Sequence, residues 1–166
     1  MKYVIRPIKK NEYHQLESLL YEAIYQPNEA CLIPREVVKL PEISVYIDDF
    51  GDKKDDHCLV ADLDGSIIGA VWTRILAGNI KGFGNIDNET PEFAISLYKE
   101  YRNRGVGTAL MCAMVKHLQN SGYKQASLNV KKENYAVRLY KKMGFEVVEE
   151  DNQDYLMLLS LPKADC

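Results

Sequence analysis

The chain has 166 residues, of which 46% are hydrophobic and 27% charged, and its formal net charge is −3. This length and composition predict a single soluble globular domain, residues 1–166, with enough apolar content for a sizeable core. The small negative charge argues against a nucleic-acid partner, which would need a basic face. No apolar run reaches transmembrane length, and the run within residues 1–7 is too short for a signal peptide. We therefore expect a cytoplasmic protein with no membrane partner.

The metal-ligating residue types are scattered along the chain. The four cysteines form no C-x-x-C pair, which predicts neither a zinc site nor a disulfide framework: Cys31, Cys58, Cys112 and Cys166. The three histidines are equally dispersed: His14, His57 and His117. No metal is expected.

In the first half of the chain, apolar periodicity and turn residues predict helices followed by a hairpin. The expected elements are a strand over 3–6, a helix over 11–24 capped by Asn11, a short helix over 35–39, a helix over 41–50, a charged turn over 48–56, and strands over 57–63 and 66–76. Asp64-Gly65 between the two strands is a strong hairpin signal. Residues 78–88, with Gly82-Phe83-Gly84, are expected to form a plain flexible loop.

In the second half, strands alternate with helices. The expected elements are a strand over 92–97, a helix over 104–120 stopped by Gly122, a strand over 125–130, a helix over 134–142, and strands over 145–149 and 155–161. Such alternation predicts parallel pairing in this half, with antiparallel strands on the flank. The sequence thus predicts an α/β fold with a mixed sheet covered by helices.

The stretch from 95 to 108 reads as a strand end, a charged turn and a glycine-opened helix. Gly105 and Gly107 allow close approach of the backbone to a ligand, and the helix start offers unpaired N–H groups to an anion such as phosphate. Arg102 and Arg104 flank the turn and are candidates to meet phosphate oxygens. A helix start beneath a solvated arginine turn fits the spacing equally well. A Walker A loop is excluded, and Leu110 stands where a dinucleotide fingerprint needs its third glycine.

Two motifs together resemble the GCN5-related N-acetyltransferases (GNAT). Arg102-x-x-Gly105-x-Gly107 after an apolar strand is similar to the acyl-CoA-binding motif of that family. The segment from Asn134 to Phe145, with Leu139-Tyr140 and Gly144-Phe145, resembles its late helix-turn-strand. The resemblance covers nearly the whole chain. It implies the acyl-CoA N-acyltransferase fold, whose mainly antiparallel central sheet contains a splayed parallel strand pair and is flanked by helices.

The resemblance also implies how acetyl-CoA, the expected co-substrate, is held. The pyrophosphate would bind the backbone of Arg102, Asn103, Arg104, Gly105, Val106, Gly107 and Thr108. The backbone of Leu97 and Tyr98 would pair with the pantetheine arm and hold the acetyl carbonyl. Asn134 would contact the pantetheine arm or the thiol side, or serve as a helix N-cap, or do both.

Two residues are candidates for proton transfer. Tyr140 lies where the family often has the acid that protonates the CoA thiolate, and a phenol remains protonated at neutral pH. Glu92 lies near where relatives often have a glutamate, and its carboxylate is the candidate base, directly or through water. Strand alternation places it on one face with Ala94 and Ser96. A packed helix tyrosine and a solvated strand-end carboxylate are the structural alternatives.

The expected reaction is direct transfer of an acetyl group from acetyl-CoA to the primary amine of a small molecule. Two alternatives stay open, namely a protein or peptide N-acetyltransferase and a non-catalytic acyl-CoA-binding module. A peptide acceptor would need an open groove between the early helices and the loop over 78–88, whereas a small amine suits a closed pocket. Aromatic residues that could line an acceptor pocket are Tyr21, Tyr25, Tyr46, Phe50, Trp72 and Phe83. The oligomeric state is left open, with a homodimer as one option.

Overall fold

The computed structural model describes residues 1–163 and contains one seven-stranded sheet with the strand order β1-β2-β3-β4-β5-β7-β6. The strands are β1 (Val4–Pro7), β2 (His57–Leu63), β3 (Ser66–Arg74), β4 (Glu92–Leu97), β5 (Gln125–Lys131), β6 (Glu146–Glu150) and β7 (Asp154–Ser160). The α-helices are α1 (Leu16–Ala23), α2 (Pro41–Ser44), α3 (Val106–Asn120) and α4 (Val137–Met143). Three short 3₁₀ helices cover Lys10–Gln15, Arg35–Lys39 and Lys99–Tyr101. Cys166, one of the four cysteines considered above, lies outside the described residues.

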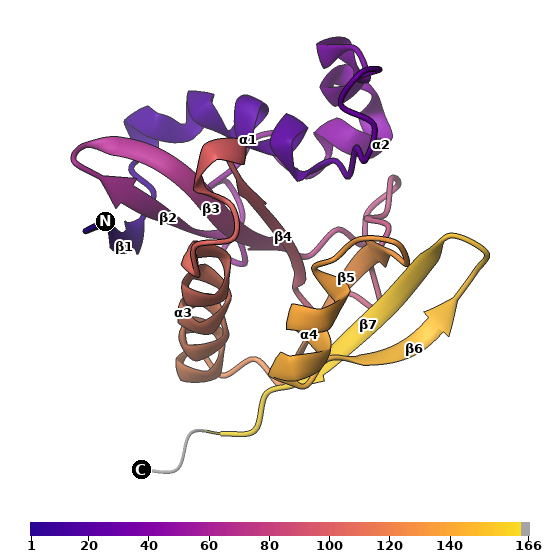
Figure 1. Ribbon diagram of the computed structural model, residues 1–166. Coiled ribbons are helices and arrows are strands. Elements are labelled where there is room, and N and C mark those ends of the chain that lie inside the picture. The colour runs from indigo at the N-terminus through magenta and orange to yellow at the C-terminus, as the bar shows by residue number, and fades with distance from the viewer. Residues whose placement is uncertain (164–166) are drawn as a thin grey trace.

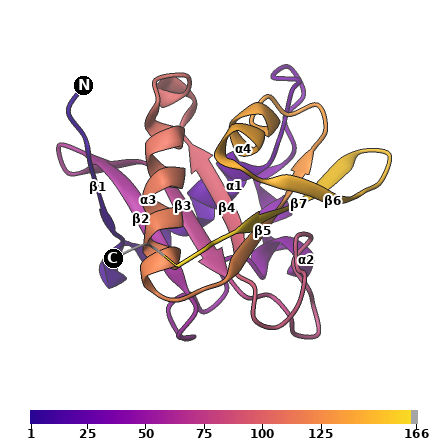
Figure 2. The same ribbon diagram turned by 90° about the horizontal axis from the view of Figure 1, so that it is seen from below.

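The helices lie in two layers on opposite faces of the sheet (Figure 1). Helices α1 and α2 cover one face, and α3 and α4 cover the other, as the view from below confirms (Figure 2). Each face has its own apolar core, one around Leu19 and Trp72 and the other around Leu110, Met114 and Met157. Within the described residues, no helix is both long enough and apolar enough to cross a membrane.

Most predicted elements are confirmed, and the differences occur at their ends. Helix α3 begins at Val106 rather than at 104, because Gly105 has a φ of +82° and is left-handed. Helix α4 begins at Val137 rather than at 134, because the Asn134 Oδ1 accepts the Ala136 N–H at 2.9 Å and forms a turn there. The first predicted helix starts as a 3₁₀ helix, in which Glu12 accepts the backbone N–H of Lys9 at 2.8 Å.

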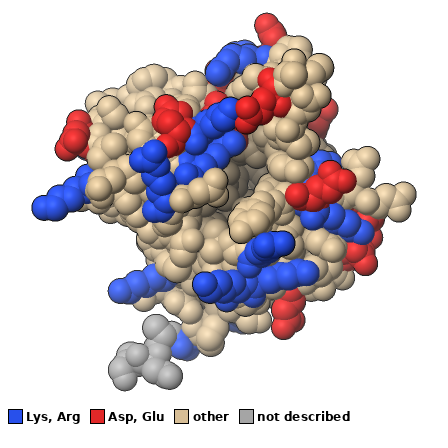
Figure 3. All heavy atoms as spheres, in the orientation of Figure 1, with Lys and Arg blue, Asp and Glu red and all other residues tan. Residues whose placement is uncertain are grey.

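Fewer strands pair in parallel than the alternation of strands and helices in the second half of the chain predicted. Only β4 and β5 run parallel among the paired strands, whereas β7 lies between β5 and β6 and is antiparallel to both. The parallel pair meets at one register position, Glu92 opposite Ser127, where the Ser127 N–H donates to the Pro91 carbonyl at 2.9 Å. Beyond that position the strands diverge, as expected for a splayed pair. The face of the molecule seen in Figure 3 is hollowed near its centre.

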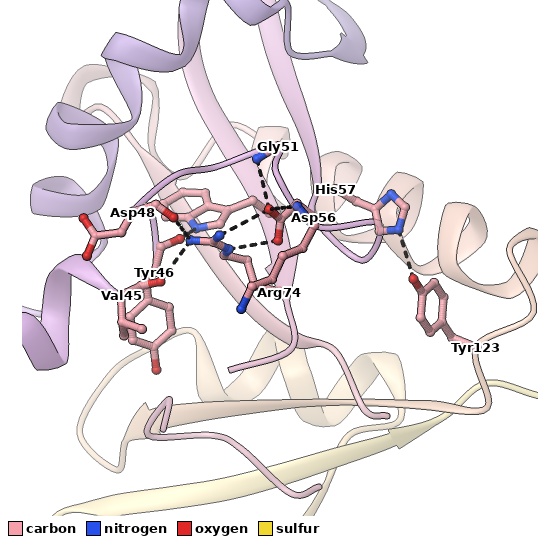
Figure 4. A network of polar contacts seen from close by, with 10 residues as sticks. Val45, Tyr46, Asp48, Gly51, Asp56, His57, Arg74 and Tyr123 are labelled. Carbon is pink, nitrogen blue, oxygen red and sulfur yellow. Dashed lines mark hydrogen bonds and ion pairs between the residues drawn. The ribbon is translucent and has the colours of Figure 1, made fainter. Parts of the chain in front are cut away.

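A buried ion pair attaches the segment after α2 to the sheet (Figure 4). The Arg74 Nε donates to Asp56 Oδ1 at 2.9 Å, and both side chains are at most 5% exposed. The Arg74 Nη1 donates to the carbonyls of Val45 at 3.0 Å and Asp48 at 2.7 Å. These carbonyls are therefore held by the arginine. Helix α2 ends at Ser44, where the sequence predicted a helix to residue 50, because the Tyr46 and Ile47 N–H groups donate to the carbonyls three residues before them, those of Ile43 and Ser44.

This ion pair yields a stability prediction. Asp56→Ala leaves the Arg74 guanidinium buried without its counter-charge, and we expect the free energy of unfolding to fall by about 3–5 kcal/mol. The measurement is urea unfolding followed by the fluorescence of Trp72, the chain's one tryptophan. The control is Lys39→Ala, which breaks the exposed Lys39–Glu17 pair and should change stability by less than about 1 kcal/mol. Equal losses in the two variants would contradict the structural role of the buried pair.

Candidate functional site

A cleft of about 1070 Å³ follows the divergence of β4 and β5. Both candidate proton-transfer residues, Glu92 and Tyr140, line it. Most of the residues expected to hold acetyl-CoA also line it: Leu97, Arg102, Asn103, Gly105, Gly107, Thr108 and Asn134. Three of the expected residues do not appear in its lining, namely Tyr98, Arg104 and Val106, and the Val106 side chain is fully buried in the core. The structure therefore brings together residues from β4, α3 and α4, of which Glu92 and Tyr140 lie 48 positions apart in the sequence.

Backbone groups of β4 point into this cleft. The Tyr98 N–H donates to the Ile68 carbonyl of β3 at 3.1 Å, so it is unavailable to a ligand. Because the hydrogen-bonding direction alternates along a strand, the N–H groups of Ile95 and Leu97 point the other way, toward the diverging β5. The Leu97 carbonyl accepts the Arg102 Nε at 3.0 Å. Ile95 is therefore a backbone site that the sequence analysis missed, although its place two residues before Leu97 on the same side was a usable signal.

The Arg102 side chain has a different partner from the phosphate suggested by the sequence. Besides the Leu97 carbonyl, its Nη2 contacts the Glu22 carboxylate at 3.2 Å, which ties the end of β4 to α1. The unpaired backbone at the start of α3 is still available for an anion, because the first hydrogen bond of the helix runs from the Ala109 N–H to the Gly105 carbonyl. Thr108 and both glycines lie at that helix start and line the cleft.

Glu92 is buried at the inner end of the cleft, with 3% of its surface exposed. Its Oε2 accepts a short hydrogen bond from the Tyr46 hydroxyl and a second from the Gly84 N–H at 3.1 Å, while Oε1 has no partner among the described residues. Burial raises the pKa of Glu92 to about 7, although both hydrogen bonds oppose that rise. The alternative of a solvated strand-end carboxylate is therefore wrong.

The loop over 78–88 covers this carboxylate. A Cβ at Gly82 would lie 2.1 Å from Glu92 Oε1, and a Cβ at Gly84 would lie 2.9 Å from both the Glu92 carboxyl carbon and the Asn129 nitrogen. The Ser127 Oγ donates to the Gly84 carbonyl at 2.5 Å, which fixes the loop against β5. Gly82-Phe83-Gly84 forms a loop, as predicted, and both of its glycines are needed for close packing on Glu92.

Tyr46 lies in the segment after α2 that Arg74 holds, and it connects that segment to Glu92. Its carbonyl accepts the Trp72 Nε1 at 3.0 Å, and its hydroxyl accepts the Phe83 N–H at 2.8 Å while donating to Glu92. Burial and the adjacent Glu92 carboxylate raise the pKa of Tyr46 well above its usual range. Tyr46 therefore stays protonated and acts as a hydrogen-bond donor to Glu92. Of the six aromatics proposed for an acceptor pocket, Tyr25, Tyr46 and Phe83 line the cleft, and Tyr21, Phe50 and Trp72 are core residues.

Tyr140 approaches the cleft from the opposite face of the sheet. It lies on α4 and packs edge-on against Phe145, which packs in turn against Phe93. Burial raises the pKa of Tyr140 to about 12, so the phenol keeps its proton at neutral pH. Glu92 and Tyr140 therefore line the same cleft and reach it from the two faces of the sheet. Among the described residues, no three potential metal ligands are grouped.

The raised pKa of Glu92 yields a prediction that is independent of any reaction. The folded chain binds this proton more tightly than the unfolded chain, so stability is lost as pH rises through about 7. We expect Glu92→Gln to escape this loss. The free energy of unfolding of the variant, relative to that of the parent, should therefore rise by about 2–3 kcal/mol as the pH is raised from 4.5 to 8. Urea unfolding at both pH values measures the difference, and a difference that does not change with pH would contradict the raised pKa.

Comparison with known proteins identifies the family. The family model for "Acetyltransferase (GNAT) family" matches residues 18–145. The chain is 32% identical over 101 residues to a mycothiol acetyltransferase of Saccharomonospora viridis, covering 60% of this chain and 32% of that protein. It is 33% identical over 113 residues to an N-alpha-acetyltransferase of Sulfurisphaera tokodaii, covering 61% of this chain and 68% of that protein. The chain thus spans about a third of the first relative's length.

Solved structures of low sequence identity share the fold. An acetyltransferase of the GNAT family from Streptococcus pneumoniae superposes with a TM-score of 0.67 at 21% identity, covering 96% of this chain and 99% of that one. The PaiA N-acetyltransferase from Thermoplasma acidophilum, solved in complex with coenzyme A, superposes with a TM-score of 0.66 at 22% identity, with the same coverage. The splayed sheet, the glycine-opened helix and the family match agree, and the chain belongs to the GNAT acetyltransferase family.

Proposed function

We propose that this acetyltransferase moves the acetyl group of acetyl-CoA directly to the primary amine of a small molecule, with Glu92 as base and Tyr140 as acid. The observation that carries the proposal is the placement of these two groups on opposite faces of the same cleft. One is a buried carboxylate whose pKa is about 7, and the other is a phenol whose pKa is about 12. At neutral pH such a pair holds one group able to accept a proton and one able to donate it.

The start of α3 fits the pyrophosphate of acetyl-CoA. Gly105 is left-handed and exposed, and a Cβ at Gly107 would come within 3.4 Å of the Leu97 side chain. The N–H groups of α3's first turn and the positive end of the helix dipole complement a phosphate anion. The backbone from Arg102 to Thr108 would therefore hold this end of the co-substrate, with Asn134 beside the pantetheine arm.

The position of Glu92 decides which backbone N–H faces the acetyl carbonyl. At about 3.3 Å per residue, Leu97 lies about 16 Å from Glu92 along β4, whereas Ile95 lies about 10 Å away. A base on Glu92 needs the reacting carbon near the inner end of the cleft. We therefore assign the Ile95 N–H to the acetyl oxygen and the Leu97 N–H to the pantetheine arm.

The residues then act in sequence on the bound substrates. Glu92, directly or through water, takes a proton from the ammonium group of the acceptor. The free amine forms a C–N bond to the acetyl carbon, and the Ile95 N–H stabilises the negative charge that develops on the carbonyl oxygen. As the C–S bond breaks, Tyr140 donates its proton to the leaving sulfur, and the second proton that the nitrogen loses on becoming an amide returns to the Tyr140 oxygen through water. Holding both reactants in one cleft supplies a further part of the rate.

Contacts around the cleft favour a small acceptor over a peptide. The Tyr46 hydroxyl accepts the Phe83 N–H, and the two rings stack at 6.4 Å, so the early helices and the 78–88 loop touch where a peptide groove would have to run. At the other end, the Tyr25 hydroxyl donates to the Glu133 carbonyl at 3.2 Å and bridges the segment after α1 to the loop before α4. These contacts support a closed pocket.

The assigned roles of Glu92 and Tyr140 are tested by removing them singly. Glu92→Gln and Tyr140→Phe should each lower kcat by about 10²–10⁴-fold with little change in CoA affinity, because each removes a proton-transfer group. Activity of the parent should rise with pH through about 7, as Glu92 loses its proton. The assay is free-thiol release from acetyl-CoA, and Tyr3→Phe, outside the cleft, is the control.

Unchanged kcat in both variants would remove these roles. Tight CoA binding without transfer to any amine would favour a non-catalytic acyl-CoA-binding module.

The phosphate-binding role of the α3 start is tested with a matched pair of glycines. Gly105 and Gly122 have φ values of +82° and +86° and lie at opposite ends of α3. Alanine at either position costs a similar backbone strain, about 1–2 kcal/mol. We expect Gly105→Ala to weaken CoA binding at least about tenfold in calorimetry, and Gly122→Ala to leave it unchanged. Equal CoA affinity in the two variants would contradict the assignment.

A further inference from the structure

The acceptor would enter from the face of the sheet that α1 and α2 cover. Glu92, Ala94 and Ser96 point to that face from β4, because side chains alternate along the strand and Phe93 packs on the opposite side. The cleft lining on this face is largely apolar, and its other polar side chains include Glu22 and Gln26. We call this part of the cleft the acceptor chamber, and its apolar lining is Leu20, Ala23, Ile24, Ile43, Tyr46, Phe83 and Ala94.

The charges in and around the acceptor chamber are unbalanced. The cations among the described residues that line the cleft are Arg102 and Lys131. Arg102 is paired with Glu22 at 3.2 Å, and Lys131 with Asp154 at 3.1 Å. Glu92, by contrast, has no cationic partner among the described residues. The chamber therefore offers an attractive carboxylate to an ammonium group and no free cation to a substrate carboxylate.

Two buried oxygens lack partners on this face. Glu92 Oε1 and Ser96 Oγ are both buried, and neither makes a hydrogen bond to a described residue. Buried polar atoms without partners are costly, and a ligand that supplies donors removes that cost. Apart from the single carboxylate, the polar atom available on β4 is thus a neutral hydroxyl. This combination suits a substrate with one cationic amine on an otherwise uncharged, mainly apolar body.

We propose that the acceptor is an apolar alkyl- or arylalkylamine that carries no carboxylate beside its amine. A carboxylate on the carbon next to the amine would enter within a few ångströms of Glu92, in an apolar chamber where like charges repel strongly. Free amino acids are therefore excluded by charge, and polyamines are disfavoured because the apolar lining around Glu92 does not stabilise a second cation. The inference rests on the proposed acetyl transfer and specifies its substrate class.

The test is a panel of amines that differ in one feature at a time, read by free-thiol release from acetyl-CoA. The panel contains phenethylamine, phenylalanine, phenylalanine amide, ethanolamine, putrescine and a tripeptide with an N-terminal phenylalanine. We expect kcat/KM for phenethylamine to exceed that for phenylalanine at least a hundredfold. Phenylalanine amide should recover most of the loss, since it keeps the size of phenylalanine and removes the charge.

A pair of loop variants tests the apolar wall. Phe83 and Ile80 are both exposed on the 78–88 loop, but only Phe83 lines the cleft. Phe83→Ala should lower kcat/KM for phenethylamine at least about tenfold more than it lowers that for ethanolamine. Ile80→Ala should leave both unchanged.

The possible outcomes separate this inference from the proposed function. Transfer that is fastest to phenylalanine, ethanolamine or putrescine would overturn the substrate class and leave acetyl transfer intact. Faster transfer to the tripeptide than to phenylalanine amide would show an open peptide groove and would also overturn it. The absence of thiol release with every amine, in a chain that binds CoA, would overturn the proposed function and this inference together.

Discussion

The divergence of β4 from β5 is the constraint on which the candidate site depends. A strand in the middle of a sheet normally has its backbone groups satisfied on both sides, but β4 is paired throughout only with β3. After the Glu92–Ser127 position, its outward N–H groups face a cleft. Unpaired N–H groups inside a sheet would cost free energy of folding, whereas beside a cleft they can donate hydrogen bonds to a substrate that carries a carbonyl and amides. The same divergence allows residues from both faces of the sheet to reach a single space.

Around that opening, the surroundings of Glu92 balance two opposing effects. Burial alone would favour the protonated acid, while the hydrogen bonds from Tyr46 and Gly84 favour the carboxylate. The result is a pKa of about 7, at which the group can exchange a proton near neutral pH. The buried Arg74–Asp56 pair contributes indirectly, because it fixes the segment that carries Tyr46.

Local features of the sequence predicted much of the fold, and most of the residues predicted for the site line the cleft. The alternation over 92–97 gave the bounds of β4, and the glycines at 105 and 107 marked the start of α3 to within two residues. The Tyr46–Glu92 contact could not be predicted in this way, because it joins residues 46 positions apart and depends on where α2 ends. The segment that carries Tyr46 is held by Arg74, whose contacts are invisible in the helical periodicity of residues 41–50. The position of β7 between β5 and β6 is likewise a matter of long-range pairing.

The glycines at 82 and 84 have a consequence for how this protein can change. They enclose Glu92 with backbone rather than with side chains, and any larger residue at either position would collide with the carboxylate. The loop therefore offers no side chain through which substitutions could adjust the acidity of Glu92. Tyr46 is the side chain that donates a hydrogen bond to it. Variation at position 46 is thus the simplest route by which descendants of this chain could acquire a different working pH.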